Sequence, residues 1–152
     1  SHMDLPLPEM NSMSNPHESA TTLMRLYELR REDKMRDART YVVRGFNPKS
    51  VEEVGALMGT EEYTYVRMVV GYWDMAASFV VHGAIDPSMF RELSGEMLAT
   101  YCKFEHMIDE IRETFGQPGL LANVQKVAED WPGAQERMEG MRAYFHELAA
   151  NS

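Results

Sequence analysis

The segment from Asp86 to Phe115, DPSMFRELSGEMLATYCKFEHMIDEIRETF, carries the clearest structural pattern in the chain. An aspartate followed by a proline is a typical beginning of a helix, and Gly116 and Pro118 are suited to end it. Its large apolar residues recur every three or four positions, which is close to the heptad seam of packed helices. The sequence therefore predicts one long helix over 86–115. The seam consists of Phe90, Leu93, Met97, Tyr101, Phe104, Ile108, Ile111 and Phe115.

The same period continues on both sides of this segment. A first long helix is expected from Asn15 to about Gly45, with Arg31 interrupting its apolar face. A short helix over 50–59 and a long one over 60–83 follow, and shorter helices come after 116. No stretch shows the sustained alternation of a strand. We predict an all-α fold, an antiparallel bundle with three long helices and two to three shorter ones, in a single domain over 16–150.

The N-terminal residues are interpreted separately. Residues 1–3 look like the remnant of a cleaved affinity tag, and 4–15 have prolines but no period, which is typical of a flexible arm. If Met3 is an engineered start, a segment such as a membrane anchor has been removed ahead of it. No apolar run in the chain approaches the ~20 residues of a membrane span. We therefore expect a cytoplasmic protein.

The composition excludes several classes of function. The chain of 152 residues has 15 basic and 24 acidic side chains, a net charge of -9, which argues against nucleic acid as a partner. A single cysteine, Cys102, rules out a disulfide framework and a multi-cysteine zinc site. No phosphate-binding loop, nucleophile elbow or zinc-protease motif occurs. We expect no enzyme activity and no cofactor.

One cluster in the seam helix has the residue types of a metal site. On a helix, His106 and Glu110 lie four apart on one face, with Asp109 beside them, and could share a divalent ion. The more ordinary interpretation is a solvated acidic face that contains a histidine. No histidine follows a glutamate by three positions, as a di-metal bundle requires. We therefore predict no metal site, with these three residues as weak candidates.

Residues 50–68, SVEEVGALMGTEEYTYVRM, have the length of a helix-turn-helix, with Gly59 at the turn. The second helix, however, begins with Glu61 and Glu62, where a DNA-binding helix would meet phosphates. The segment carries four acids against Arg67, so it would repel DNA. DNA binding remains an alternative rather than the main prediction.

Two stretches, 26–43 and 65–113, resemble a bacterial family, the domain of unknown function 4760. The likeness rests on the helix with Arg39, the Tyr72–Trp73 pair, the turn over 82–86, the Phe90–Leu93 segment and Arg112. It extends over about residues 26–131. The resemblance implies an all-helical fold, in some members after a membrane segment. It implies no activity and no catalytic residues.

The leading expectation is a helical module that binds a protein partner and self-associates as a homodimer. A helix as long as 86–115 leaves an apolar side that a second copy would cover; the alternative is that the C-terminal helices of the same chain cover it. A small-molecule or metal-binding bundle, with a pocket beside Trp73, is a further alternative. Buried anchors are expected at Trp73, Phe90, Tyr101 and Phe104, and polar ties within or between chains at Arg31, Arg39 and Arg112.

Overall fold

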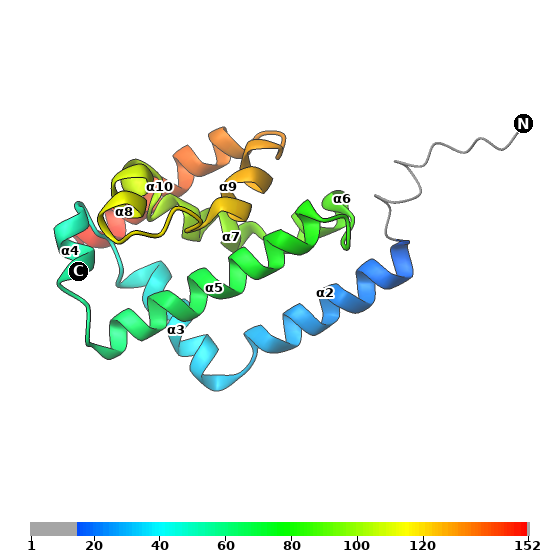
Figure 1. The fold of residues 1–152 in the computed structure, drawn as a ribbon, viewed down its shortest axis with the longest axis horizontal. Helices are drawn as coiled ribbons and strands as arrows, with labels where there is room; N and C mark the ends of the chain where they lie inside the picture. Colours follow the sequence, from blue (N-terminus) through cyan, green and yellow to red (C-terminus); the bar gives the residue numbers. More distant parts are fainter. Residues whose placement is uncertain (1–14, 152) are drawn as a thin grey trace, which may run out of the picture.

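The computed structural model describes residues 15–151, which form an all-α bundle without strands (Figure 1). The all-α class is therefore confirmed, whereas the predictions for 1–3 and 4–14 lie outside the described residues. The helices are α2 (Pro16–Arg30), α3 (Asp33–Arg44), α4 (Val51–Gly55), α5 (Glu61–Val81), α6 (Pro87–Leu93), α7 (Gly95–Cys102), the 3-10 turn η1 (Glu105–Met107), α8 (Ile108–Thr114), α9 (Ala122–Glu129) and α10 (Ala134–Ala150).

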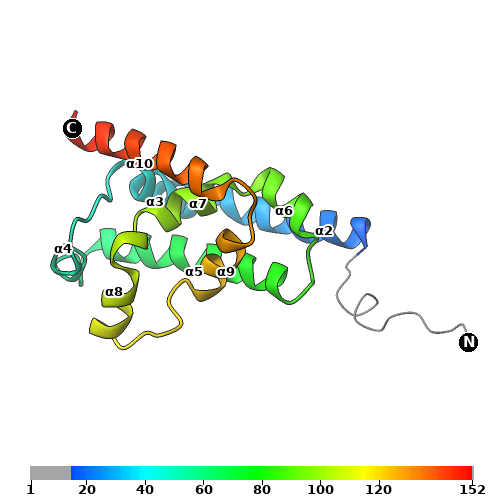
Figure 2. The same cartoon turned by 90° about the horizontal axis from the view of Figure 1, so that it is seen from above.

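Helices α5 and α7 form the centre of the bundle. Helix α5 runs across the middle of the molecule, and α3 and α9 pack along it (Figure 2). Helix α7 is buried on every side, since each residue from Met97 to Cys102 is buried, and it contacts α3, α5, α9 and α10. A helical segment that is buried all round lies in the core, so the part of α7 from Met97 to Cys102 is the innermost in the bundle.

The predicted continuous helix over 86–115 is wrong, because the chain bends twice within it. The first break is at Ser94, whose φ of -124° and ψ of 30° end α6 before Gly95 begins α7. Adjacent serine and glycine residues are a frequent cause of sharp helix kinks. The second break is at Lys103, after which η1 leads into α8. The two bends fold the segment into the centre of the domain.

The predicted helix over 15–45 is also divided. Helix α2 ends at Arg30, and Glu32 has extended backbone. The Glu32 carboxylate accepts hydrogen bonds from the backbone N–H groups of Lys34 and Met35, so it acts as the N-cap of α3. In the sequence, the place where α2 ends coincides with Arg31, the residue that interrupts the apolar face.

The seam of 86–115 is covered within the chain. Phe90, Met97, Tyr101, Phe104 and Ile111 are at most 4% exposed. Helices α9 and α10 pack against α7, which is the alternative in which the C-terminal helices cover this side. Of the eight seam residues only Leu93 is exposed, so the rest of the seam offers no surface to a second copy.

The predicted helix starts are confirmed at four places. The side chains of Asn15, Ser50, Thr60 and Asp86 each accept a hydrogen bond from the backbone N–H three residues later. These contacts satisfy donors that a helix leaves unpaired at its first turn. Among the helices of the described residues, none is both long and apolar enough to cross a membrane.

Helix α9 begins differently, because its cap comes from another helix. Leu121 before it has a left-handed backbone, with φ at 54°, and supplies no side-chain cap. The Asp74 carboxylate of α5 instead accepts bonds from the backbone N–H groups of Asn123 (3.0 Å) and Val124 (3.1 Å) and from the Asn123 amide. This carboxylate attaches α9 to α5 at the positive end of the α9 dipole.

We expect Asp74→Ala to lower the free energy of unfolding by about 1 kcal/mol, since three bonds to one helix start are lost. Asp74→Asn keeps an acceptor and should lose less. Urea denaturation of both variants measures the difference. Equal losses would mean that charge, and not hydrogen bonding, gives this cap its strength.

Candidate functional site

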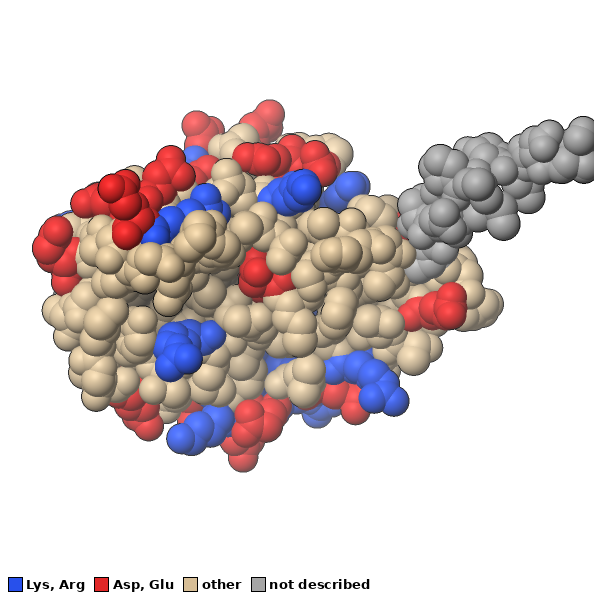
Figure 3. All heavy atoms as spheres, viewed as in Figure 1, with Lys and Arg blue, Asp and Glu red and all other residues tan. Residues whose placement is uncertain are grey.

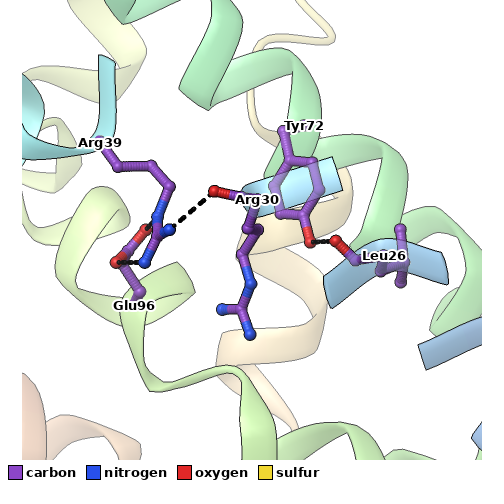
Figure 4. Close-up of polar contacts among 5 residues, drawn as sticks. All are labelled: Leu26, Arg30, Arg39, Tyr72 and Glu96. Carbon is purple, nitrogen blue, oxygen red and sulfur yellow. Dashed lines mark hydrogen bonds and ion pairs between the residues drawn. The ribbon is translucent and has the colours of Figure 1, made fainter. Parts of the chain in front are cut away.

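A polar junction holds the end of α2 against the core (Figure 4). The Arg39 guanidinium of α3 donates to both carboxylate oxygens of Glu96 on α7, from Nε at 2.8 Å and from a terminal nitrogen at 3.0 Å. The other terminal nitrogen donates to the backbone carbonyl of Arg30 at 3.0 Å. One side chain thus joins α3, α7 and the last residue of α2. The bonds to Glu96 raise the pKa of Arg39 above its ordinary value, so the pair stays charged.

Two further contacts fix α2 along its length. The Tyr72 hydroxyl of α5 donates to the Leu26 carbonyl at 2.7 Å, and burial raises the pKa of Tyr72 to about 12. Near the other end, the backbone N–H of Asp86 donates to the Ser19 hydroxyl at 3.0 Å. These bonds give α2 a defined position although its buried stripe is narrow, with only Ser19, Leu23 and Leu26 buried.

The outward side of α2 carries a second apolar stripe, which we name the α2 edge: Ala20, Met24 and Tyr27, with Leu93 of α6, which lines the same small cavity as Tyr27. All four residues are exposed, Met24 at 61%, Tyr27 at 48% and Leu93 at 51%. The apolar positions that the sequence predicts for this helix are Ala20, Leu23, Met24 and Tyr27, and of these four only Leu23 is buried. Helix α2 is at the margin of the bundle, so only one side of it is covered (Figure 1).

Arg30 connects the α2 edge with the core. Its guanidinium carbon lies 5.1 Å from the Tyr27 ring centroid and 5.3 Å from that of Trp73. This stacking orients the exposed tyrosine. Arg30 Nε and Trp73 Nε1 are buried and have no hydrogen-bond partner among the described residues. The cavity beside Trp73 measures about 10 Å³, so it can take no ligand larger than a water molecule.

The sequence also predicts buried anchors in the core and two further polar ties, at Arg112 and Arg31. Trp73, Phe90, Tyr101 and Phe104 are all buried in the core. Arg112 Nε donates to the Leu120 carbonyl at 2.9 Å, and one terminal nitrogen donates to the Gln125 amide oxygen at 2.7 Å. It therefore ties the turn before α9 to α8. Arg31 is exposed at the break between α2 and α3.

The three metal candidates are not brought together. The His106 ring faces the Pro48 carbonyl, with Nε2 at 3.1 Å, and Asp109 lies 3.7 Å from Arg112. His106 is in the 3-10 turn and Glu110 is in α8, so the expected single helical face does not form. Among residues 15–151, no three histidine, cysteine or acidic side chains lie close enough to hold a metal ion.

The segment 50–68 folds as α4, a turn and the beginning of α5. Gly59 has φ at 85°, which suits the turn. Glu61 and Glu62 are exposed in the first turn of α5. Beyond this first part, α5 is the central helix of the bundle and lies between α3 and α9.

Charge is unevenly distributed on the surface. Carboxylates gather over the part of the molecule where α8 and α10 lie, whereas both signs occur along α2 and α3 (Figure 3). Residues 25–44 contain seven basic and four acidic side chains. A mixed surface of this kind offers complementary charges to a partner.

Sequence reasoning missed Glu96, Tyr72 and Lys103 as polar ties. Glu96 and Arg39 are separated by 57 positions, and no local pattern connects them. Lys103 is the one charged residue in the mostly apolar run from Met97 to Phe104, and this charge was the available signal.

The fold and the α2 edge define a small all-helical domain with an exposed apolar margin. The chain belongs to the family described as "Domain of unknown function (DUF4760)", whose profile matches residues 16–131. The match confirms the resemblance and extends it toward the N-terminus to include all of α2. No curated protein matches the chain, and no solved structure does.

Proposed function

We propose that this domain is a protein-interaction module that self-associates through the α2 edge, with α2 of one copy lying antiparallel to α2 of another. The exposed stripe Ala20, Met24 and Tyr27 carries the proposal. Its spacing of four and three positions is that of a helix-pairing seam. A helix with one buried stripe and a second apolar stripe beside it has the pattern of an element that packs on both sides.

The charges of α2 favour an antiparallel pair. Glu18 lies in the first turn, whereas Arg30 and Arg31 stand at its end. An antiparallel pair centred on Met24 places the acidic first turn of one copy level with the basic last turn of the other, although the Glu18 side chain itself points away from the α2 edge. The helix dipoles also oppose each other favourably in this arrangement. Tyrosine and arginine, which meet at Tyr27 and Arg30, are residue types enriched in interface hot spots.

The expected affinity is modest. Helix α2 has 15 residues, so it is about 22 Å long. Such a contact falls at the lower end of the size of specific interfaces, which bury ~800 Å² per partner. We therefore expect a dimer that dissociates on dilution through the micromolar range.

Sedimentation velocity over micromolar to millimolar concentrations tests the proposal. The unmodified protein should change from monomer to dimer as its concentration rises. Met24→Glu should abolish the dimer, because it places two carboxylates against each other at the centre of the pair. Since Met24 is 61% exposed, this variant should fold normally, which circular dichroism checks.

The matched control is Met58→Glu. Met58 is 47% exposed and follows α4, away from α2, so dimer formation should be unaffected. A protein that stays monomeric at millimolar concentration overturns the proposal. A dimer that Met24→Glu leaves intact overturns it equally.

A further inference from the structure

A second surface feature lies at the C-terminal end of the bundle, in a pocket between the 45–50 turn, the end of α7 and α10. Its volume is about 210 Å³. Among the described residues, the pocket is lined by basic, apolar and neutral polar side chains and by no acidic one, in a chain with 24 acids and 15 bases. The lining residues with basic groups are Lys49, Lys103, His106, Arg142 and His146.

Lys103 is the innermost of these groups. It is 4% exposed, and its ammonium donates to the Asn47 side-chain oxygen at 2.8 Å and to the Val43 carbonyl at 3.0 Å. It also lies 3.6 Å from the centroid of the Phe145 ring. All these partners are neutral, and no carboxylate of the described residues pairs with it. Burial without a counter-ion lowers the pKa of Lys103 to about 8.

Arg142 lies on the α10 side of the pocket. One terminal nitrogen donates to Glu105 at 2.7 Å, and its side chain is 39% exposed. Glu105 therefore offsets the charge of Arg142, and the charge of Lys103 has no carboxylate partner among the described residues. His106 and His146 are both exposed and lie at the pocket. Uncompensated positive charge between low-dielectric walls concentrates anions.

We propose that this pocket binds a small organic anion, with a carboxylate or phosphate head bonded to Arg142 and attracted by the buried charge of Lys103, and a short apolar body against Phe145 and Pro48. The guanidinium supplies donors in the fixed geometry that an oxyanion needs, and the aromatic ring supplies an apolar wall. The volume is below that of a drug-sized pocket, which limits the ligand to about ten non-hydrogen atoms. The proposal is independent of dimer formation, because α2 contributes no residue to the pocket.

Titration of the 15N-labelled protein, followed by NMR, tests the proposal with benzoate, phenyl phosphate and inorganic phosphate as probes. Saturable shifts should appear around 47–49, 102–106 and 142–149. Stronger binding of benzoate identifies a carboxylate site, and stronger binding of phenyl phosphate identifies a phosphate site. Neutral benzamide should not bind. If neither organic anion gives saturable shifts in this region at millimolar concentration, the proposal is wrong.

Two variants establish the role of charge. Arg142→Gln should weaken binding about tenfold or more, because a charged donor is lost, whereas Glu105→Gln should strengthen it by releasing Arg142. Arg137→Gln is the control, since Arg137 is on the same helix but stacks on Trp131 and is not in the pocket. Equal affinity in all three variants overturns the assignment of the anion to Arg142.

Discussion

Replacing Arg39 with methionine is expected to lower the free energy of unfolding by about 2 to 3 kcal/mol. The substitution leaves the Glu96 carboxylate without its bidentate partner and the Arg30 carbonyl without a donor. The side chains of Arg39 and Glu96 are only 28% and 21% exposed, so water replaces the lost bonds incompletely. This partial exposure keeps the expected loss below that for a fully buried pair, which is 3–5 kcal/mol.

The effect should be largest at α2. Besides its narrow buried stripe, α2 depends on the bonds from Arg39, Tyr72 and Asp86. Hydrogen exchange should therefore accelerate over 16–30 in the Arg39→Met variant while α5 keeps its protection. Urea denaturation gives the global loss, and exchange locates it.

The control for this prediction is Arg36→Met. Arg36 lies on the same helix and is exposed, so its removal should change the free energy of unfolding by less than about 0.5 kcal/mol. A double-mutant cycle with Glu96→Met isolates the coupling of the pair. A coupling near zero, or a loss equal to that of Arg36→Met, would show that the junction does not hold α2.

The sequence predicted those parts of the fold that depend on local chemistry. A cap such as Ser50 and the backbone it binds are only three residues apart, so spacing alone identifies it. The breaks at Arg31 and Ser94 were missed, because apolar residues recur every three or four positions on both sides of a bend. Periodicity reports that a residue is on a helix, but it does not report whether the helix continues.

The candidate surfaces were harder to predict for a related reason. Ala20, Leu23, Met24 and Tyr27 form one apolar stripe in sequence, and only the packed structure shows that Leu23 and Leu26 face the core whereas the other three are exposed. The pocket around Lys103 joins segments that begin at Asn47, Cys102 and Arg142. Such a site is created by packing between distant segments, and no motif marks it.

Lys103 should make the free energy of unfolding of this protein rise with pH around pH 8. Its pKa is lowered from 10.5 to about 8 in the folded chain, so the unfolded chain binds more protons between these values. The free energy of unfolding therefore rises with pH over this window. The full penalty, on the order of 3 kcal/mol, applies below pH 8. Between pH 7 and pH 9 we expect a rise of about 1 kcal/mol from this group.

Lys103→Met is the variant that removes this dependence. At pH 7 its net effect is small, because relief of the buried charge is offset by the unpaired Val43 carbonyl and Asn47 amide oxygen. The informative quantity is the slope: the free energy of unfolding of the variant should lack the rise between pH 7 and pH 9. The neighbouring titratable groups, Cys102, Glu105, His106, Arg142 and His146, are present in both proteins, so their contributions largely cancel.

The upper limit of the window is set by Cys102. Burial raises the pKa of its thiol from 9.0 to about 11, so above pH 9 the folded chain retains this proton longer and stability falls. Denaturation curves at pH 7, 8 and 9 therefore separate the lysine from the thiol. Exposed Lys126 serves as the control, and Lys126→Met should keep the rise. If the free energy of unfolding changes with pH in the same way in the unmodified protein and in Lys103→Met, then Lys103 carries no unfavourable charge in the folded chain. The two pH dependences can differ only if the folded and unfolded chains bind different numbers of protons at Lys103.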